Sequence, residues 1–555
     1  MSSAPTLLRP SVTLLLSAAL ALPWLLAPSP VPDAVLYNQI AALAAWGVWL
    51  ASGACFAWRA AAPALAALLL CAVLAAAGGF ALQGGVALML LSATLVLAAA
   101  AARADVASTR IVALGLWLAG LGSAGVALVQ FLAPGWTDGW LIAASSTGGR
   151  AVGNLRQPNH LATALLCAMV WTVWLWQAGS LGGRAATASV AAMLLALAMT
   201  ASRTGALSLV VLVAWAALDK RLPRNARGLL ATTPLLYGLC WALLAGHAAL
   251  QEEHFYGSDR LQAGGDISSS RFAIWRNALA LLAEHPWAGV GWGHFNAAWT
   301  FTPFPGRPVA FFDHTHNLPL QLAVELGLPA AVTILGLLGW TLWRARAAWG
   351  SAAPASPARA ALAMVAVLAL HSLLEYPLWY AYFLLPAAWA LGVFVGGAPR
   401  TVAPSAAGMR WAARAAGTAM AAGALWAGAD HRRVEVIFAP AAGAEPLARR
   451  IEAGQRSALF GHHADYAAVT TPPRDTAAAR FRRPLRQLID VRLLIAYIEA
   501  LKREGRVAEA LYAAQRLREF HRPDAQAYFK DCEAAAPPWQ CDTRPVALQW
   551  RDLMP

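Results

Sequence analysis

The sequence predicts an all-helical protein that crosses a membrane many times. Hydrophobic residues make up 59% of its 555 residues, and only 13% are charged. The mean hydropathy is +0.52, whereas a soluble domain carries about 25% charged residues. The apolar residues come in blocks of about 17 to 25, the length needed to cross a hydrocarbon core of roughly 30 Å. These observations exclude a soluble globular enzyme and a disordered or fibrous protein.

The apolar blocks predict thirteen membrane spans. They lie near residues 11–27, 35–57, 61–81, 86–102, 111–133, 160–178, 185–201, 204–218, 228–249, 317–343, 360–374, 377–397 and 411–428. The first block could be a signal peptide, because Arg9 precedes it. Its exit, Ala27-Pro28-Ser29-Pro30, is a poor cleavage site, so we interpret the block as a span.

The basic residues predict the orientation of these spans. The net charge is +14, but the Arg residues are divided between short loops and a polar tail and form no continuous stripe, which argues against nucleic-acid binding. One set of alternate connections carries Arg9, Arg59, Arg103, Arg110, Arg184, Lys220, Arg221, Arg224, Arg227, Arg344, Arg346, Arg359, Arg400, Arg410 and Arg414. The opposite set, apart from one long loop, has only Arg150, Arg156 and Arg203. The positive-inside rule therefore predicts a cytoplasmic N-terminus, and an odd number of spans puts the C-terminal tail on the far side of the membrane, the periplasmic side in a bacterium.

We accordingly expect a membrane domain over residues 1–429, with a periplasmic loop at 250–316, and a periplasmic helical tail over 430–555. In the loop, Ser268-Ser269-Ser270 can cap a helix from Arg271 to Glu284. Its apolar side would lie in the membrane interface, and Arg271, Arg276 and Asn277 would form its polar side.

The tail contains a predicted helical hairpin over 490–523, with its turn at Gly505, which resembles one tetratricopeptide unit. A single unit cannot bury its apolar face, so it must pack on helices in 444–483 or on the membrane domain. Cys532 and Cys541 are close enough in sequence to form a disulfide, which would suit the oxidising periplasm.

Polar residues gather in four clusters at the predicted periplasmic ends of spans. The clusters are Gly153–His160; Ser202–Gly205; His314–Asn317, followed by Glu325; and His371–Pro377, followed by Tyr380 and Tyr382. Each alone has an ordinary structural interpretation, as a helix cap, a contact with lipid headgroups or a satisfied hydrogen-bonded pair. Polar groups within membrane segments are costly, however, and all four clusters fall on one predicted side. Together they indicate a functional site.

The residue types in these clusters limit the chemistry. They supply Arg, His, Gln, Asn and Tyr with few carboxylates, and no Asp-x-Asp motif occurs in the loops. A metal-dependent transferase would need paired acidic ligands, so we expect neither a metal nor another cofactor. Guanidinium groups can stabilise a pyrophosphate leaving group, such as that of a polyprenyl pyrophosphate. A His beside the bilayer could take the proton of an acceptor hydroxyl.

At these residues the chain resembles the Wzy/WaaL superfamily of bacterial O-antigen polymerases and ligases. Within it, the chain is most similar to the PglL/PilO-type protein O-oligosaccharyltransferases. The resemblance covers roughly 150–545 and rests on GNLRQPNHLA from Gly153, SRTG from Ser202, HPWAGVGWGHF from His285, HNLPLQLAVELG from His316 and EYPLWYAYF from Glu375.

The resemblance implies a metal-independent transfer of a preassembled glycan. The donor would be an undecaprenyl pyrophosphate-linked oligosaccharide, and the acceptor a Ser or Thr hydroxyl of a periplasmic, pilin-like protein. His316 would be essential and would activate the hydroxyl, while Arg203, with Arg271 or Arg276, would hold the pyrophosphate. The other implicated residues are Gln157, Tyr376 and Glu375 in catalysis and Asn159, Asn317, Tyr380 and His314 in orienting substrates.

Two other functions remain open from the sequence. The same chemistry could serve another acceptor, in a ligase that uses the lipid A core or in a polymerase that uses a second lipid-linked glycan. A transporter of lipid-linked sugars would show inverted repeats and charged groups at the bilayer midplane. We see no repeat, and the charged candidates gather at one face, which favours a transferase.

Overall fold

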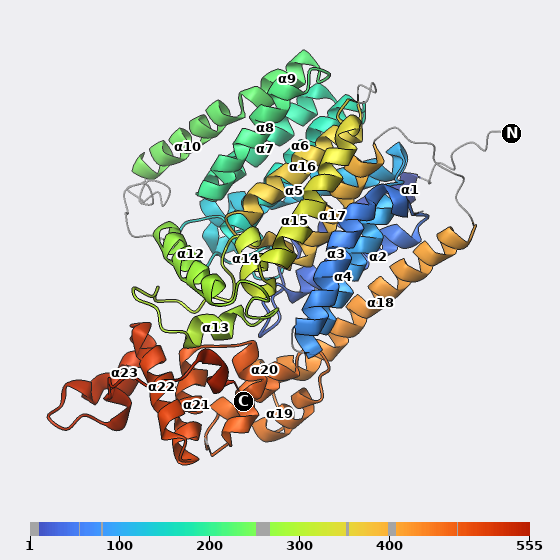
Figure 1. Ribbon diagram of the computed structural model, residues 1–555. Coiled ribbons are helices and arrows are strands. Elements are labelled where there is room, and N and C mark those ends of the chain that lie inside the picture. The colour runs from blue at the N-terminus through green and yellow to red at the C-terminus, as the bar shows by residue number, and fades with distance from the viewer. Residues whose placement is uncertain are drawn as a thin grey trace. The chain divides into compact units, whose positions relative to one another are not determined.

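The computed structural model describes residues 10–54, 56–78, 81–250, 267–350, 355–397, 407–473 and 475–554. Arg9 and Arg400, which the sequence argument used, lie outside these ranges. All regular elements among the described residues are helices, as predicted (Figure 1). The contacts divide the chain into two compact units. The first comprises Met1–Leu69, Leu90–Gly264 and Gly336–Trp426, and the second comprises Leu70–Met89, Gly265–Leu335 and Ala427–Pro555.

The first unit is built around one buried helix, α6 (Pro158–Gln177). It contacts α5, α7, α8 and α16, and these helices run roughly parallel in Figure 1. Beyond its first turns, which carry Asn159, His160 and Thr163, α6 is largely apolar on all sides, as suits a helix enclosed by other helices. The surrounding helices are α1 (Pro10–Leu25), α2 (Leu36–Ala51), α5 (Val106–Leu132), α7 (Gly183–Met199), α8 (Arg203–Leu218), α9 (Arg224–Ala231), α10 (Thr233–Leu250), α16 (Pro357–Ser372) and α17 (Ala381–Gly396).

Four further helices contribute residues to both units. They are α3 (Trp58–Gly78), α4 (Ala81–Ala101), α15 (Leu328–Arg344) and α18 (Ala407–Phe438). The last of these has 32 residues and continues ten residues beyond 428, where the sequence analysis ends the last span.

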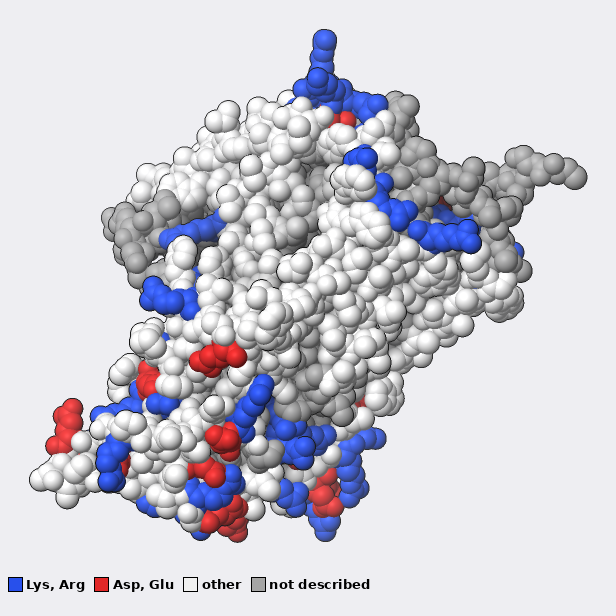
Figure 2. Space-filling model, viewed as in Figure 1, with Lys and Arg blue, Asp and Glu red and all other residues white. Residues whose placement is uncertain are grey.

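The surface of α10 has the character of a lipid-facing helix. Leu235, Leu239, Leu243 and Leu250 are all more than half exposed, and the first three are spaced four residues apart on one side. Figure 2 shows the surface over α8 and α10 as almost entirely uncharged, with Lys and Arg gathered at the end near α9. A contiguous apolar surface of this kind is costly in water and favourable in lipid.

Four described helices are long and apolar enough to cross a membrane, namely Val106–Leu132, Pro158–Gln177, Thr233–Leu250 and Leu328–Ala348; seven shorter ones are also apolar. The structure is therefore consistent with an all-helical membrane protein, and the count of thirteen spans and their orientation stay predictions. The block at 317–343 is divided by Gly327, whose positive φ of 83° ends one helix before the next begins. The block at 228–249 is likewise divided, at Thr232.

An ion pair buried in the first unit joins two segments far apart in sequence. Arg359 Nε lies 2.8 Å from Asp219 Oδ2, and both side chains are 2% exposed. Trp215 also donates to this carboxylate, from one turn earlier. Arg359, which the sequence analysis counted among the basic loop residues, is therefore a buried structural residue that ties α16 to the end of α8.

The second unit contains the described part of the long loop and the whole described tail. The loop elements are α12 (Ile267–Glu284) and α13 (Phe295–Phe301), and α14 (Leu318–Leu326) follows the loop. The tail elements are α19 (Leu447–Gln455), α20 (Gly461–Thr470), α21 (Val491–Arg503), α22 (Val507–Glu519), α23 (Gln526–Phe529) and several short 3-10 turns. The tail surface carries interspersed acidic and basic groups in Figure 2.

The predicted tail hairpin is confirmed as α21 and α22, with Gly505 at the turn in the left-handed conformation. The Asp490 side chain caps α21 by accepting from the Leu493 N–H, at 2.8 Å. The hairpin packs on α20, as expected, and also on α13, where the Tyr512 hydroxyl donates to the Phe301 carbonyl at 2.7 Å. The expected Cys532–Cys541 disulfide is present, with Cα atoms 5.3 Å apart.

Helix α12 differs from its prediction in two respects. It begins at Ile267, so Ser268-Ser269-Ser270 lie within it instead of capping it. Its buried side is formed by Ile274, Asn277 and their neighbours, so Asn277 does not belong to the polar side. Phe272, although apolar, is 68% exposed. The buried side is set by packing against α14, which the sequence of α12 alone does not specify.

Candidate active site

Three of the four polar clusters enter their helices through the same backbone arrangement. A non-glycine residue in the left-handed conformation is followed by an N-cap residue, whose side-chain oxygen accepts from the N–H three residues later. The pairs are Arg156 and Gln157 before α6, Ala201 and Ser202 before α8, and His316 and Asn317 before α14; the first residues have φ of 59°, 46° and 56°, and the caps measure 2.7, 2.9 and 3.0 Å. Such strained residues concentrate at functional sites. The caps also show that the oxygens of Gln157 and Asn317 already serve the fold.

Within the first unit, Asn159 joins three of the clusters. Its Oδ1 accepts from the Ser202 hydroxyl at 2.6 Å, and its Nδ2 donates to Glu375 Oε1 at 3.1 Å. Glu375 is only 6% exposed, so this donor compensates a largely desolvated carboxyl group. We call Ser202, Asn159 and Glu375 the Asn159 network. It brings together segments that are 43 and 216 residues apart in the chain.

A second set of contacts lies one residue along α6. His160 Nδ1 is 3.0 Å from the Tyr382 hydroxyl, and the His160 ring packs edge-on to Tyr380 with centroids 4.6 Å apart. One turn further, the Thr163 hydroxyl is 2.8 Å from His371 Nδ1. Helix α6 thus contacts the fourth cluster at two successive turns, through His160 and Thr163.

The predicted tyrosines form a row of neighbouring aromatic rings beside His160. The rings of Tyr376 and Tyr380 are stacked with centroids 6.1 Å apart, and Tyr380 and Tyr382 follow at 5.2 Å. Tyr376 and Tyr380 are half-buried, whereas Tyr382 is fully buried. Of these three, Tyr376 and Tyr380 are therefore the ones that a substrate could reach.

The basic residues of the first unit differ in their environments. Arg156 donates to the Ala27 carbonyl, and the Asn154 side chain donates to the carbonyls of Leu25 and Leu141. These bonds anchor the loop before α6. Arg203 is the first residue of α8 and its side chain is exposed.

In the second unit, hydrogen bonds of Thr315 fix the backbone next to His316. The Thr315 N–H donates to Gln321 Oε1 at 2.7 Å, and the Thr315 carbonyl accepts from the Trp275 indole at 3.0 Å. The Thr315 hydroxyl donates to the Asn317 carbonyl at 2.9 Å. His316 itself is half-buried, so its backbone is fixed by α12 and α14 while its imidazole stays partly accessible.

Glu325 and the glycine-rich turn at 289–293 form one structure. Glu325 Oε1 accepts from the Gly293 N–H at 2.9 Å, and the Val290 and Gly291 N–H groups donate to the carbonyls of Val324 and Glu325 at 2.8 and 3.0 Å. Glu325 is 4% exposed. Two of the stretches that carry the family resemblance are therefore joined directly, and Glu325 is an anchor for the turn.

The remaining candidates also lie in the second unit. His314 Nδ1 is 2.9 Å from the exposed Asp313 carboxylate. Arg271 is half-buried and Arg276 is exposed, both on α12, which contacts α14. Among the described residues, no three His, Cys, Asp or Glu side chains are arranged to hold a metal ion.

The sequence reasoning did not single out Thr163 or Gln321. Each lies four residues after a predicted site residue, Thr163 after Asn159 and Gln321 after Asn317. Residues four apart share one side of a helix, so this spacing was the available signal.

Three family models match the chain. An O-antigen ligase model matches residues 188–335, a model of the C-terminal part of a virulence factor membrane-bound polymerase matches 359–532, and a protein glycosylation ligase model matches 151–176. These matches support the resemblance to the Wzy/WaaL superfamily of O-antigen ligases and polymerases, and to its PglL/PilO type.

Two relatives from Acinetobacter baylyi (strain ATCC 33305 / BD413 / ADP1) support this assignment. A ComP-specific O-oligosaccharyltransferase is 26% identical over 260 residues, which is 46% of this chain and 45% of the relative. A general O-oligosaccharyltransferase is 25% identical over 271 residues, with the same coverage. The chain spans about half the length of the curated relatives it matches.

Proposed function

We propose that this protein is an O-oligosaccharyltransferase that moves a preassembled glycan from undecaprenyl pyrophosphate to a Ser or Thr hydroxyl of a periplasmic protein. The observation that carries this proposal is the match to two relatives that are named O-oligosaccharyltransferases. In this proposal the protein lies in the inner membrane with its tail in the periplasm, where the lipid-linked donor and the acceptor protein meet.

In the proposed reaction, the acceptor hydroxyl oxygen attacks the anomeric carbon of the first sugar. The bond from that carbon to the pyrophosphate oxygen breaks, and the hydroxyl proton passes to His316. Arg203, with Arg271 or Arg276, binds the departing pyrophosphate, because guanidinium groups bind such oxygens bidentately. The arginines then neutralise the negative charge of the pyrophosphate, which a divalent cation would otherwise neutralise. The reaction therefore needs no metal.

The other residues have positioning roles in this proposal. Gln157 has its oxygen engaged as a helix cap, so its amide nitrogen is the group that would contact sugar or acceptor. Asn159 and Glu375 hold each other, which supports a role in shaping the site. Tyr376, Tyr380, Asn317 and His314 are half-buried and could contact substrate.

The test is transfer in vitro with purified protein, a lipid-linked oligosaccharide and a pilin-like acceptor, in the presence of EDTA. Glycosylated acceptor is the expected product. If added Mg²⁺ or Mn²⁺ were required, the metal-free step would be wrong.

A second candidate is a polymerase or a ligase with a lipid-linked acceptor, because two of the matching models describe an O-antigen ligase and a virulence factor polymerase. The same assay separates them. Growth of longer lipid-linked chains without acceptor glycosylation would indicate a polymerase, and transfer to lipid A core would indicate a ligase.

A further inference from the structure

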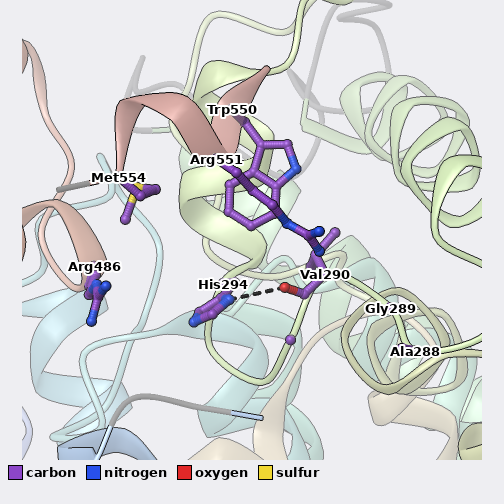
Figure 3. Close-up of a pocket in the computed structure, with 9 residues that line it drawn as sticks. Ala288, Gly289, Val290, His294, Arg486, Trp550, Arg551 and Met554 are labelled. Carbon is purple, nitrogen blue, oxygen red and sulfur yellow. Dashed lines mark hydrogen bonds between the residues drawn. The ribbon is translucent and has the colours of Figure 1, made fainter. Parts of the chain in front are cut away.

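The second unit contains a cavity that the proposed transfer does not use. It has a volume of about 370 Å³, and its lining includes Val290, His294, Arg486, Trp550, Arg551 and Met554. This size falls within the range of roughly 300–1,000 Å³ typical of small-molecule sites. Figure 3 shows His294 between Arg486 on one side and Arg551 on the other.

Three separate segments supply the polar groups of this cavity. His294 comes from the end of the glycine-rich turn, Arg486 from the short turn Pro484–Arg486, and Arg551 from the turn Trp550–Leu553 near the end of the chain. None of the nine lining residues is acidic. Two guanidinium groups and an imidazole therefore share one cavity without a carboxylate in its wall.

Several neighbouring positive charges act on the basic groups of the cavity. Burial and the neighbouring Arg482 lower the pKa of Arg486 to about 10. Burial, with Arg486 and Arg551, lowers the pKa of His294, although a hydrogen bond to Val290 opposes the shift. Each of these shifts disfavours the positively charged form of the group. A bound anion would favour that charged form and so oppose the shift.

Two polar groups of the cavity, His294 and Arg551, are preorganised. His294 Nδ1 is 3.0 Å from the Val290 carbonyl, which fixes the orientation of the ring. The guanidinium of Arg551 lies over the Trp550 indole, 5.1 Å from the ring centroid, while Trp550 is 6% exposed and so firmly held. An arginine held against an aromatic ring can present its donors to an oxyanion at a reduced entropic cost.

We propose that this cavity binds an oxyanion carried by a small ring-sized group, such as the carboxylate of an acidic sugar or the phosphate of a phosphorylated one. Arg486 and Arg551 bind the oxyanion, and Trp550, Val290 and Met554 contact the less polar body. The choice of a sugar rests on the proposed glycan transfer, and the binding itself does not require turnover.

The experiment measures binding to the full-length protein in detergent by saturation-transfer difference NMR, which detects weak ligands. The probes are glucuronate, glucose 6-phosphate and uncharged glucose. We expect at least one acidic sugar to bind, glucose to bind far more weakly, and Arg486→Gln or Arg551→Gln to weaken acidic-sugar binding by roughly tenfold or more. Comparison of the two acids identifies whether carboxylate or phosphate is preferred.

The control variant is Arg544→Gln, which alters an arginine of the same tail whose side chain is 87% exposed. It should bind the acidic sugar as the wild type does. Arg551 is itself exposed, so its variant tests the proposal even if Arg486→Gln is unstable.

Failure of both acids to bind, equal binding of glucose, or wild-type binding by the Arg551 variant would each overturn the proposal. Because no step of this experiment depends on transfer, its failure is distinguishable from failure of the proposed function, which the transfer assay decides.

Discussion

Two kinds of residue stand out in this protein: residues with an unusual backbone conformation, and residues whose hydrogen bonds compensate the burial of a partner. His316 adopts a φ of 56° directly before the N-cap of α14, and its neighbour Thr315 is bonded to Gln321 and Trp275. Asn159 satisfies the buried carboxyl group of Glu375. Both positions can therefore be tested by substitutions that separate the backbone from the side chain.

Replacement of His316 should show whether its imidazole takes part in the reaction. Asn tolerates the left-handed conformation well, so His316→Asn keeps the backbone and removes the base. We expect transfer to fall by roughly 100-fold or more while the thermal unfolding temperature stays close to wild type. Near-normal transfer by this variant would remove His316 from the proposed mechanism.

Replacement of Asn159 should weaken the fold as well as the site. Asn159→Ala leaves Glu375 buried without this donor, so we expect a loss of about 1–3 kcal/mol, measured by unfolding in detergent. The matched control is Asn225→Ala, at an exposed position of α9, which should change stability little. Equal effects of the two substitutions would show that the Asn159 network contributes nothing.

At the scale of elements, Gly289 and Gly327 permit a close approach between two backbone segments of the second unit. A Cβ atom at Gly327 would lie 2.2 Å from the Trp287 carbonyl oxygen, and one at Gly289 would lie 2.5 Å from the Glu325 backbone. Only glycine allows the turn at 289–293 to contact the end of α14 at this distance. The division of the predicted span 317–343 thus serves this packing.

Two glycine substitutions separate this close approach from backbone strain. Gly306 has a positive φ of 68°, and a Cβ there would contact nothing within 4 Å. Gly306→Ala should therefore cost only about 1–2 kcal/mol. Gly327→Ala adds a steric clash and should cost roughly 3 kcal/mol or more, measured by the same unfolding assay. The packing argument fails if the two variants are equally stable.

At the scale of the molecule, distant parts of the chain are joined by buried polar contacts inside each unit. In the second unit, Arg307 donates to the carbonyls of Trp299 and Thr302, lies 3.3 Å from Glu519 on α22, and stacks over Phe520 at 4.4 Å. Burial lowers its pKa to about 10, despite the opposing effect of Glu519. This arginine ties the long loop to the tail hairpin.

Loss of that contact should loosen the loop. Arg307→Ala removes a buried charge from its partners, so we expect a loss of about 3 kcal/mol and faster proteolysis of the segment between α13 and α14. Arg544→Ala, at an exposed tail position, is the control and should leave the cleavage rate unchanged. Unaltered proteolysis of the Arg307 variant would argue against the tail as a support for the loop.

The sequence by itself determined the helical membrane class, the positions of the polar clusters, the tail hairpin and the disulfide. These follow from local features: lengths of apolar blocks, helical periodicity, capping residues and cysteine spacing. It did not determine that Asn159 would meet both Ser202 and Glu375, that Arg359 would be buried against Asp219, or that Asn277 would face inward. Only the tertiary structure decided these pairings, because each depends on which helices pack together across tens to hundreds of residues, and one sequence pattern is compatible with many such partners.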